Sequence, residues 1–225
     1  MTKTTTRYVN FQTLQARGPS ANTVIKLMMA CNDLSLANQS LSNWKNELSS
    51  NKKSQRRGAG MYFVRTQIAH LYEALYVVEE IKRAPILMET VLRCDSQTQK
   101  SFEELGQFLP NAPKRAEIEK LVDPVRNRLT FHYNNCGNLI EKEVSNQAGE
   151  SGARMSSVTR GNTAHLWHFK IADDIVDDIV VHQFWGISRD ANSQNEADKV
   201  VDRVHQIFVW FMDFSGEFIW MYCDT

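Results

Sequence analysis

The amino-acid sequence predicts an all-α fold. Apolar residues recur at intervals of three and four positions along most of the chain, and the strict alternation typical of half-buried strands is scarce. Pro85, Pro110 and Pro113 interrupt this periodicity between longer and shorter helical stretches. The 225 residues show no shift in composition, so we expect a polar N-terminal segment, residues 1–19, and one helical domain, residues 20–225.

Two long helices are expected first, at residues 20–47 and 59–83. Ser20 or Asn22 is a suitable N-cap for the first of them. Each stretch carries an apolar stripe at helical spacing, which predicts one buried face per helix. The expected inner residues are Val24, Leu27, Met28, Cys31, Leu34 and Leu41 in the first helix, and Phe63, Ile68, Leu71, Leu75 and Val78 in the second.

Shorter helices follow, at residues 86–93 and 97–109. A longer helix is expected over residues 114–145, in which Pro124 either begins a new helix or kinks the existing one. Residues 146–163 are rich in Gly, Ser and Asn and predict a mobile loop. The remaining helices lie within residues 165–222: an amphipathic one at 171–185 and an aromatic one at 194–221.

Charge and cysteine content set limits on function. Lys and Arg number 26, as do Asp and Glu, so a nucleic-acid contact must come from a local basic patch. The only dense cationic run, between the two long helices, either touches RNA backbone or is a solvated connection. The four cysteines form no C-x-x-C pair, which favours reduced thiols in the cytoplasm. The basic residues of that run are Lys52, Lys53, Arg56 and Arg57.

No membrane attachment is expected. The first residues are polar and lack the apolar run of a signal peptide. The most apolar window, residues 207–222, is interrupted by Asp213 and Glu217 and is shorter than the roughly 20 residues that a bilayer span requires.

The segment from Arg126 to Tyr133 is the strongest functional signal. Arg126 carries a permanent planar cation that suits phosphate oxygens, and His132 can exchange a proton near neutral pH. Asn127 adds an amide beside them. This combination can cleave a phosphodiester without a metal or another cofactor.

The spacing Arg126-x5-His132, with Asn127 in the polar position, resembles the R-x4–6-H motif of HEPN domains. The order of helices before the motif is also similar, and the resemblance covers about residues 20–144. It implies a HEPN-like antiparallel helical bundle, here with additional C-terminal helices. It also implies a metal-independent endoribonuclease, as in toxins or phage-defence effectors, acting as a homodimer whose two motif helices form a composite site.

The same resemblance assigns roles to the motif residues. His132 would be the general acid or base, Arg126 would bind the scissile phosphate, and Asn127 would orient His132 or the phosphate. On an ideal helix Arg126 and His132 lie about 120° apart, whereas Arg128 shares the face of His132. Arg128 is therefore a second candidate phosphate ligand, and Tyr133 could support the site.

A second Arg-x4-His spacing, Arg65 to His70, falls on the second long helix. The surrounding apolar residues favour a core-facing position. His70 and Glu73 could still support the main site from a neighbouring helix.

Two further patterns lead to other functional hypotheses. Asp174, Asp178 and His182 are spaced four apart and could hold a divalent cation, but acidic residues on a polar helix face are usually solvated, so no metal is predicted. The aromatic residues of 194–221 exceed what one buried face needs. They indicate either a central core helix or a surface for a protein partner such as an antitoxin, and the partner surface favours a non-catalytic HEPN-like interaction module. The aromatic residues are Trp210, Phe211, Phe214, Phe218, Trp220 and Tyr222.

Overall fold

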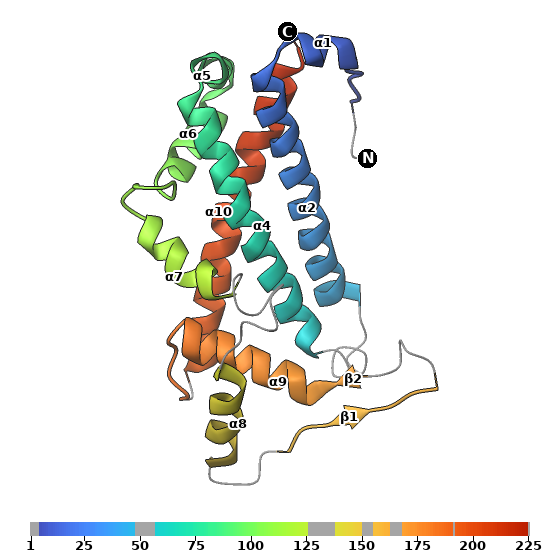
Figure 1. The fold of residues 1–225 in the computed structure, drawn as a ribbon, viewed down its shortest axis with the longest axis vertical. Helices are drawn as coiled ribbons and strands as arrows, with labels where there is room; N and C mark the ends of the chain where they lie inside the picture. The colour runs from blue at the N-terminus through green and yellow to red at the C-terminus, as the bar shows by residue number, and fades with distance from the viewer. Residues whose placement is uncertain are drawn as a thin grey trace. The chain divides into compact units, whose positions relative to one another are not determined.

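The all-α prediction is confirmed by the computed structural model (Figure 1), which describes residues 5–47, 57–125, 138–149, 155–162, 168–190 and 192–224. Its helices are α1 (Phe11–Ala16), α2 (Pro19–Glu47), α4 (Arg57–Arg83), α5 (Pro85–Arg93), α6 (Ser96–Gly106), α7 (Arg115–Val125), α8 (Leu139–Gly149), α9 (Lys170–Asp178), the π-helix η4 (Ile179–Phe184) and α10 (Ser193–Tyr222). Two short strands, β1 (Val158–Thr159) and β2 (His168–Phe169), pair antiparallel with Val158 opposite Phe169.

The chain divides into two compact units. Unit 1 contains Met1–Leu34, Leu71–Arg115 and His205–Thr225, and unit 2 contains Ser35–His70 and Ala116–Val204. Three boundaries fall inside α2, α4 and α10, so each unit includes a part of all three long helices, and the fourth follows Arg115, the first residue of α7.

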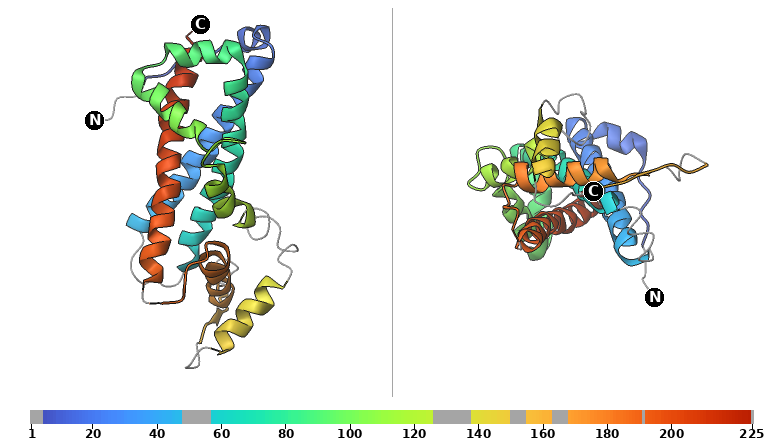
Figure 2. Two further views of the ribbon diagram at one scale, coloured as in Figure 1. Left: turned by 90° about the vertical axis from the view of Figure 1, so that its left-hand side faces the viewer. Right: turned by 90° about the horizontal axis from the view of Figure 1, so that it is seen from below.

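Unit 1 is held together by an aromatic and aliphatic core. Within unit 1, the parts of α2, α4 and α10 lie side by side, as Figure 1 and Figure 2 show. Phe214 of α10 is fully buried between Phe102 of α6 and Phe218, with ring centroids 4.9 and 5.2 Å apart. Burial of a large apolar side chain stabilises a fold by about 1.5–3 kcal/mol, so this cluster is a major source of stability in unit 1.

The aromatic helix α10 is therefore a central core helix. Phe211, Phe214 and Phe218 are fully buried, and Tyr222 is 5% exposed. The half-buried Trp220 is covered by the guanidinium of Arg7, whose carbon lies 4.0 Å from the ring centroid. Phe211, Phe214, Phe218 and Tyr222 thus belong to the core of unit 1, whereas Trp210 and Trp220 are half-buried. The prediction of a partner surface on this helix therefore cannot rest on the four buried rings.

The N-terminal segment has more structure than its polar sequence predicted. Asn10 caps α1 by accepting a hydrogen bond from the Gln12 amide at 2.7 Å. Gly18, at φ +62°, then takes a left-handed conformation that suits glycine, and Pro19 begins α2 with its preset φ. Ser20 is therefore not the N-cap, and its hydroxyl instead donates to the Arg17 carbonyl at 3.0 Å.

Unit 2 contains α7, α8, α9 and η4. The predicted helix over 171–185 is present, but it changes to π-helical geometry at Ile179. Ile179, Val180 and Phe184 are buried there, whereas Ile171, which helical spacing predicts on the same apolar side as Ile179, is 46% exposed. A π-helix rotates successive side chains differently from an α-helix, which a constant helical period cannot predict.

Two other expectations in unit 2 are corrected. The predicted helix over 114–145 is not continuous, because Asn138 lies in a turn and its carbonyl accepts the Lys142 amide at the start of α8. The predicted loop over 146–163 is partly regular, since α8 extends to Gly149 and β1 lies within it. The small polar residues of this stretch do not predict the end of α8 or the strand β1.

Candidate functional site

The motif residues Arg126, Asn127, Arg128, His132 and Tyr133 lie outside the described residues. Helix α7 leads directly into them and ends at Val125, which is fully buried. Pro124 lies in the last turn of α7 and does not begin a new helix. The chain thus enters the motif from a helix whose last residue is fixed in the core of unit 2.

An ion pair also fixes the beginning of α7. Arg203 of α10 donates to the Glu117 carboxylate through Nε at 2.6 Å and through its terminal nitrogen at 3.3 Å. Such bidentate pairs hold geometry better than single contacts. Glu117, near the start of α7, and Val125, at its end, are therefore both held within unit 2.

The other predicted site residues are only partly described. Lys52, Lys53 and Arg56 lie outside the described residues, and Arg57 is the first residue of α4, with its side chain also outside the description. His70 is half-buried and Glu73 is exposed on α4. Three positions separate them, which puts both on one side of that helix.

The carboxylates proposed as metal ligands are engaged by protein donors. Asp174 accepts from Ser156 at 2.6 Å and from Lys170. Asp178 accepts from Gln147 at 2.9 Å and from Arg189 at 3.3 Å. In the part of the chain that the structure describes, no three His, Cys, Asp or Glu side chains gather as a metal site would require.

Asp177 is a further carboxylate on the acidic face of α9, and the expectation that such residues are solvated is wrong for it. Its Oδ1 is shielded from solvent and has no hydrogen-bond partner among the described residues. Burial raises the pKa of Asp177 to about 7, and the charge of Arg65 only partly opposes this. The nearby carboxylates of Asp173, Asp174 and Asp178 raise the pKa further.

A buried carboxylate organises α8 and η4. Glu143 is fully buried and accepts hydrogen bonds from Arg189, from Gln183 at 2.9 Å and from Gln147 at 3.3 Å. Burial alone would raise the pKa of Glu143, but these hydrogen bonds and the Arg189 charge hold it below its usual value. The cluster therefore carries an ionised carboxylate with its donors in place, as a structural ion pair does.

His182 lies at the edge of this cluster. Its Nδ1 is 2.8 Å from the Ile187 carbonyl and so donates to it, while Nε2 is 3.9 Å from Asp178. The carbonyl fixes the ring within the turn that follows η4.

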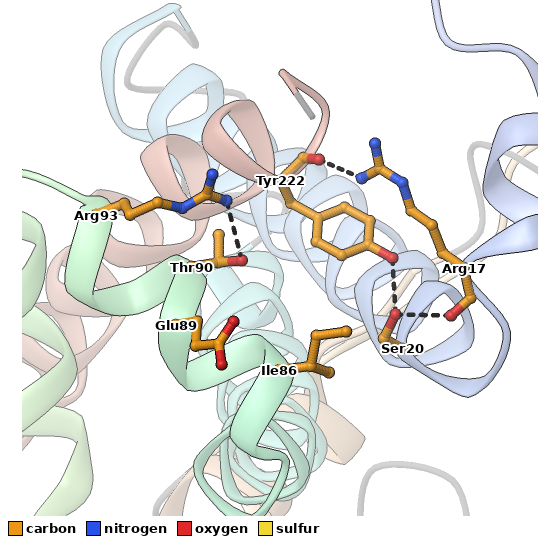
Figure 3. A pocket seen from close by; sticks show the side chains of 7 residues that line it. All are labelled: Arg17, Ser20, Ile86, Glu89, Thr90, Arg93 and Tyr222. Carbon is orange, nitrogen blue, oxygen red and sulfur yellow. Dashed lines mark hydrogen bonds between the residues drawn. The ribbon is translucent and has the colours of Figure 1, made fainter.

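A pocket of about 360 Å³ opens in unit 1 (Figure 3). Its lining comes from the start of α2, from α5 and from the end of α10, which are far apart in the sequence. Two guanidinium groups border it on either side of the Tyr222 ring. The lining residues are Arg17, Ser20, Ile86, Glu89, Thr90, Arg93 and Tyr222.

Hydrogen bonds fix the Tyr222 side of this pocket. The Ser20 hydroxyl donates to the Arg17 carbonyl, so the Tyr222 hydroxyl, 3.0 Å from Ser20 Oγ, is the donor between the two. Arg17 donates to the Tyr222 carbonyl and stacks on its ring, 4.5 Å from the centroid. The sequence analysis missed this pocket because no local motif links its three elements.

Comparisons with protein-family models, with curated proteins and with solved structures found no match. Among the described residues, no helix combines the length and the apolar character needed to cross a membrane.

Proposed function

We propose that this chain is a metal-independent HEPN-like endoribonuclease. The observation that carries the proposal is the Arg126-x5-His132 motif with Asn127. Two features of the described residues support it: the helical fold, and the anchored helix α7 that ends immediately before Arg126. The buried end of α7 gives the motif a fixed starting point, which positioned catalytic groups need.

In the proposed reaction the ribose 2′-oxygen attacks the phosphorus and the bond to the 5′-oxygen breaks. His132 either removes the 2′-hydroxyl proton as a base or, when protonated, supplies the proton that the leaving 5′-oxygen takes up, and water exchanges the other proton. Arg126 neutralises the charge that develops on the phosphate oxygens, and Asn127 orients His132 or the phosphate. The products are a 2′,3′-cyclic phosphate and a 5′-hydroxyl, without a bound metal.

A homodimer completes this proposal. Arg126 and His132 are about 120° apart on an ideal helix, so one motif helix does not present both on one face. Two motif helices facing each other allow groups from both copies to converge on one phosphate. Arg128 is the alternative phosphate ligand, and His70, Glu73 and Tyr133 are supporting residues in the same proposal.

The biological setting belongs to the proposal as well. A ribonuclease of this kind acts on RNA in the cytoplasm, as a toxin or a phage-defence effector, with an antitoxin or another protein as its regulator. The basic run of Lys52, Lys53, Arg56 and Arg57 would bind RNA backbone, which predicts RNA affinity that weakens as salt rises.

Cleavage of labelled RNA in excess EDTA tests the proposal. We expect His132→Ala to slow cleavage by about 10²–10⁴-fold and Arg126→Ala by about 10²–10³-fold. His205→Ala is the matched control, because His205 is exposed on α10 and stacks on Phe208 of its own helix. If no RNA is cleaved, or if the variants cleave like the parent, the chain is instead a non-catalytic interaction module.

A further inference from the structure

The pocket in unit 1 has the charge and donors to bind an anion. Arg17 and Arg93 contribute two cations and Glu89 one anion, which leaves a net positive lining. Neither guanidinium pairs with a carboxylate among the described residues: Arg17 donates to the Tyr222 carbonyl, and Arg93 donates to Thr90 Oγ1 at 3.4 Å. Most of their N–H groups are thus available to a ligand.

The hydroxyl groups that line the pocket contribute little to the donors available to an anion. The Ser20 and Tyr222 hydroxyl protons are both used within the protein, by the Arg17 carbonyl and by Ser20 Oγ. Thr90 Oγ1 accepts from Arg93, and Thr90 is only 4% exposed, so recognition of an anion falls mainly on the guanidinium groups. Their planar arrays of donors match the oxygens of a phosphate dianion.

One of the two cations is held in place before any ligand arrives. Arg17 is fixed by its stacking on Tyr222 and by the bond to the Tyr222 carbonyl, so less side-chain entropy is lost when it binds. Arg93 is exposed at the end of α5 and can adjust to the ligand.

The rest of the lining indicates what the anion is attached to. Ile86 is 62% exposed beside the pocket and offers an apolar contact. Glu89 has no ion-pair partner in the described parts of the chain, and its carboxylate can accept a hydrogen bond from a hydroxyl or an amine. The volume of about 360 Å³ lies at the lower end of the range for small-molecule sites.

We propose that this pocket binds a small phosphate monoester of the size of a 5′-mononucleotide. Arg17 and Arg93 hold the phosphate, Ile86 contacts the body of the ligand, and Glu89 accepts a hydrogen bond from it. None of these residues belongs to the Arg126 to Tyr133 motif, so this inference does not rest on the proposed ribonuclease activity.

Isothermal titration calorimetry at low salt tests the proposal, with uridine 5′-monophosphate as the probe and uridine as the control ligand. We expect the monophosphate to bind and uridine not to bind. Arg93→Gln should weaken binding about tenfold or more, because each hydrogen bond to a charged group is worth about 1.4 kcal/mol or more. Arg17→Gln should act in the same direction.

Two further variants separate recognition from unfolding. Arg83→Gln removes an exposed cation of α4 that pairs with Glu79 outside the pocket, and it should bind like the parent. Glu89→Gln should tighten binding of inorganic phosphate about two- to threefold, because it removes a like charge from the lining. The proposal is overturned if uridine binds as well as its monophosphate, if neither binds at millimolar concentration, or if Arg93→Gln binds like the parent.

Discussion

The two units of this protein are stabilised in different ways. Unit 1 buries rings of Phe102, Phe214 and Phe218 against one another, and Lys26 and Glu80 form an ion pair at its surface. Unit 2 buries an ionised carboxylate, Glu143 of α8, which pairs with Arg189 in the segment after η4.

This difference determines how each unit should respond to a change. Hydrophobic burial is non-directional and is nearly independent of pH, so the unit 1 core should respond to the volume of its side chains. A buried ion pair depends on the geometry and ionisation of both partners. Unit 2 should therefore respond to charge and pH.

The largest effect is expected from Phe214→Ala. This change leaves a cavity beside Phe102 and Phe218 and should lower the free energy of unfolding by about 3–5 kcal/mol. Urea denaturation followed by circular dichroism measures it. Phe11→Ala, at a ring that is 87% exposed, should change stability by less than about 0.5 kcal/mol.

In unit 2, Arg189→Ala should lower the free energy of unfolding by about 2–3 kcal/mol. It leaves the buried Glu143 charge with only neutral amide donors. The double variant Glu143→Leu and Arg189→Met removes both charges and should recover part of the loss. If Arg189→Ala is as stable as the parent, the ion pair with Glu143 does not hold α8 to the segment after η4.

Asp177→Asn should change the pH dependence of stability. Between the usual pKa of 3.8 and about 7, the unfolded chain releases the Asp177 proton while the folded chain retains it. Raising the pH through this window therefore favours unfolding, and the contribution of Asp177 to stability is lost near pH 7. Thermal melts across this range should show a flatter profile for Asp177→Asn than for the parent.

Glu143, in the same unit, should give the opposite dependence of stability on pH. Its pKa is lowered, so its contribution is present above the usual value of 4.5 and is lost as the pH falls through its folded pKa. Glu143→Gln should reduce the acid sensitivity of the parent. An identical acid profile in both proteins would contradict the ionised state assigned to Glu143.

The smallest effect is expected at the surface of unit 1. Lys26→Ala removes the ion pair with Glu80, in which both side chains are about half exposed, and should lower stability by about 0.2–1 kcal/mol. The loss should shrink further in high salt, because screening weakens exposed pairs. A loss as large as that of Arg189→Ala would remove the contrast between the two units.

Periodicity predicted the apolar core well. Val24, Leu27, Leu34 and Leu41 are buried as expected, because burial of one helix face leaves a repeating pattern in the chain. In α9, periodicity failed for Ile171, which is exposed, and for Asp177, whose carboxylate is shielded from solvent, because the burial of each side chain depends on tertiary packing.

The polar sites were much harder to predict. Arg189 reaches Glu143 across 46 positions, and the pocket brings Arg17 and Tyr222 together across 205. Such partners are not separated by any regular interval in the sequence. They can therefore be recognised only once the fold is known. Arg126 and His132 are the opposite case. Their spacing is evident in the sequence, but both residues lie outside the described part of the chain.

The most direct test of the proposed ribonuclease activity is analysis of the RNA ends after cleavage in EDTA. We expect 2′,3′-cyclic phosphate and 5′-hydroxyl ends that form without metal and disappear with His132→Gln. Products with 3′-hydroxyl ends, or cleavage that persists unchanged in His132→Gln, would contradict it.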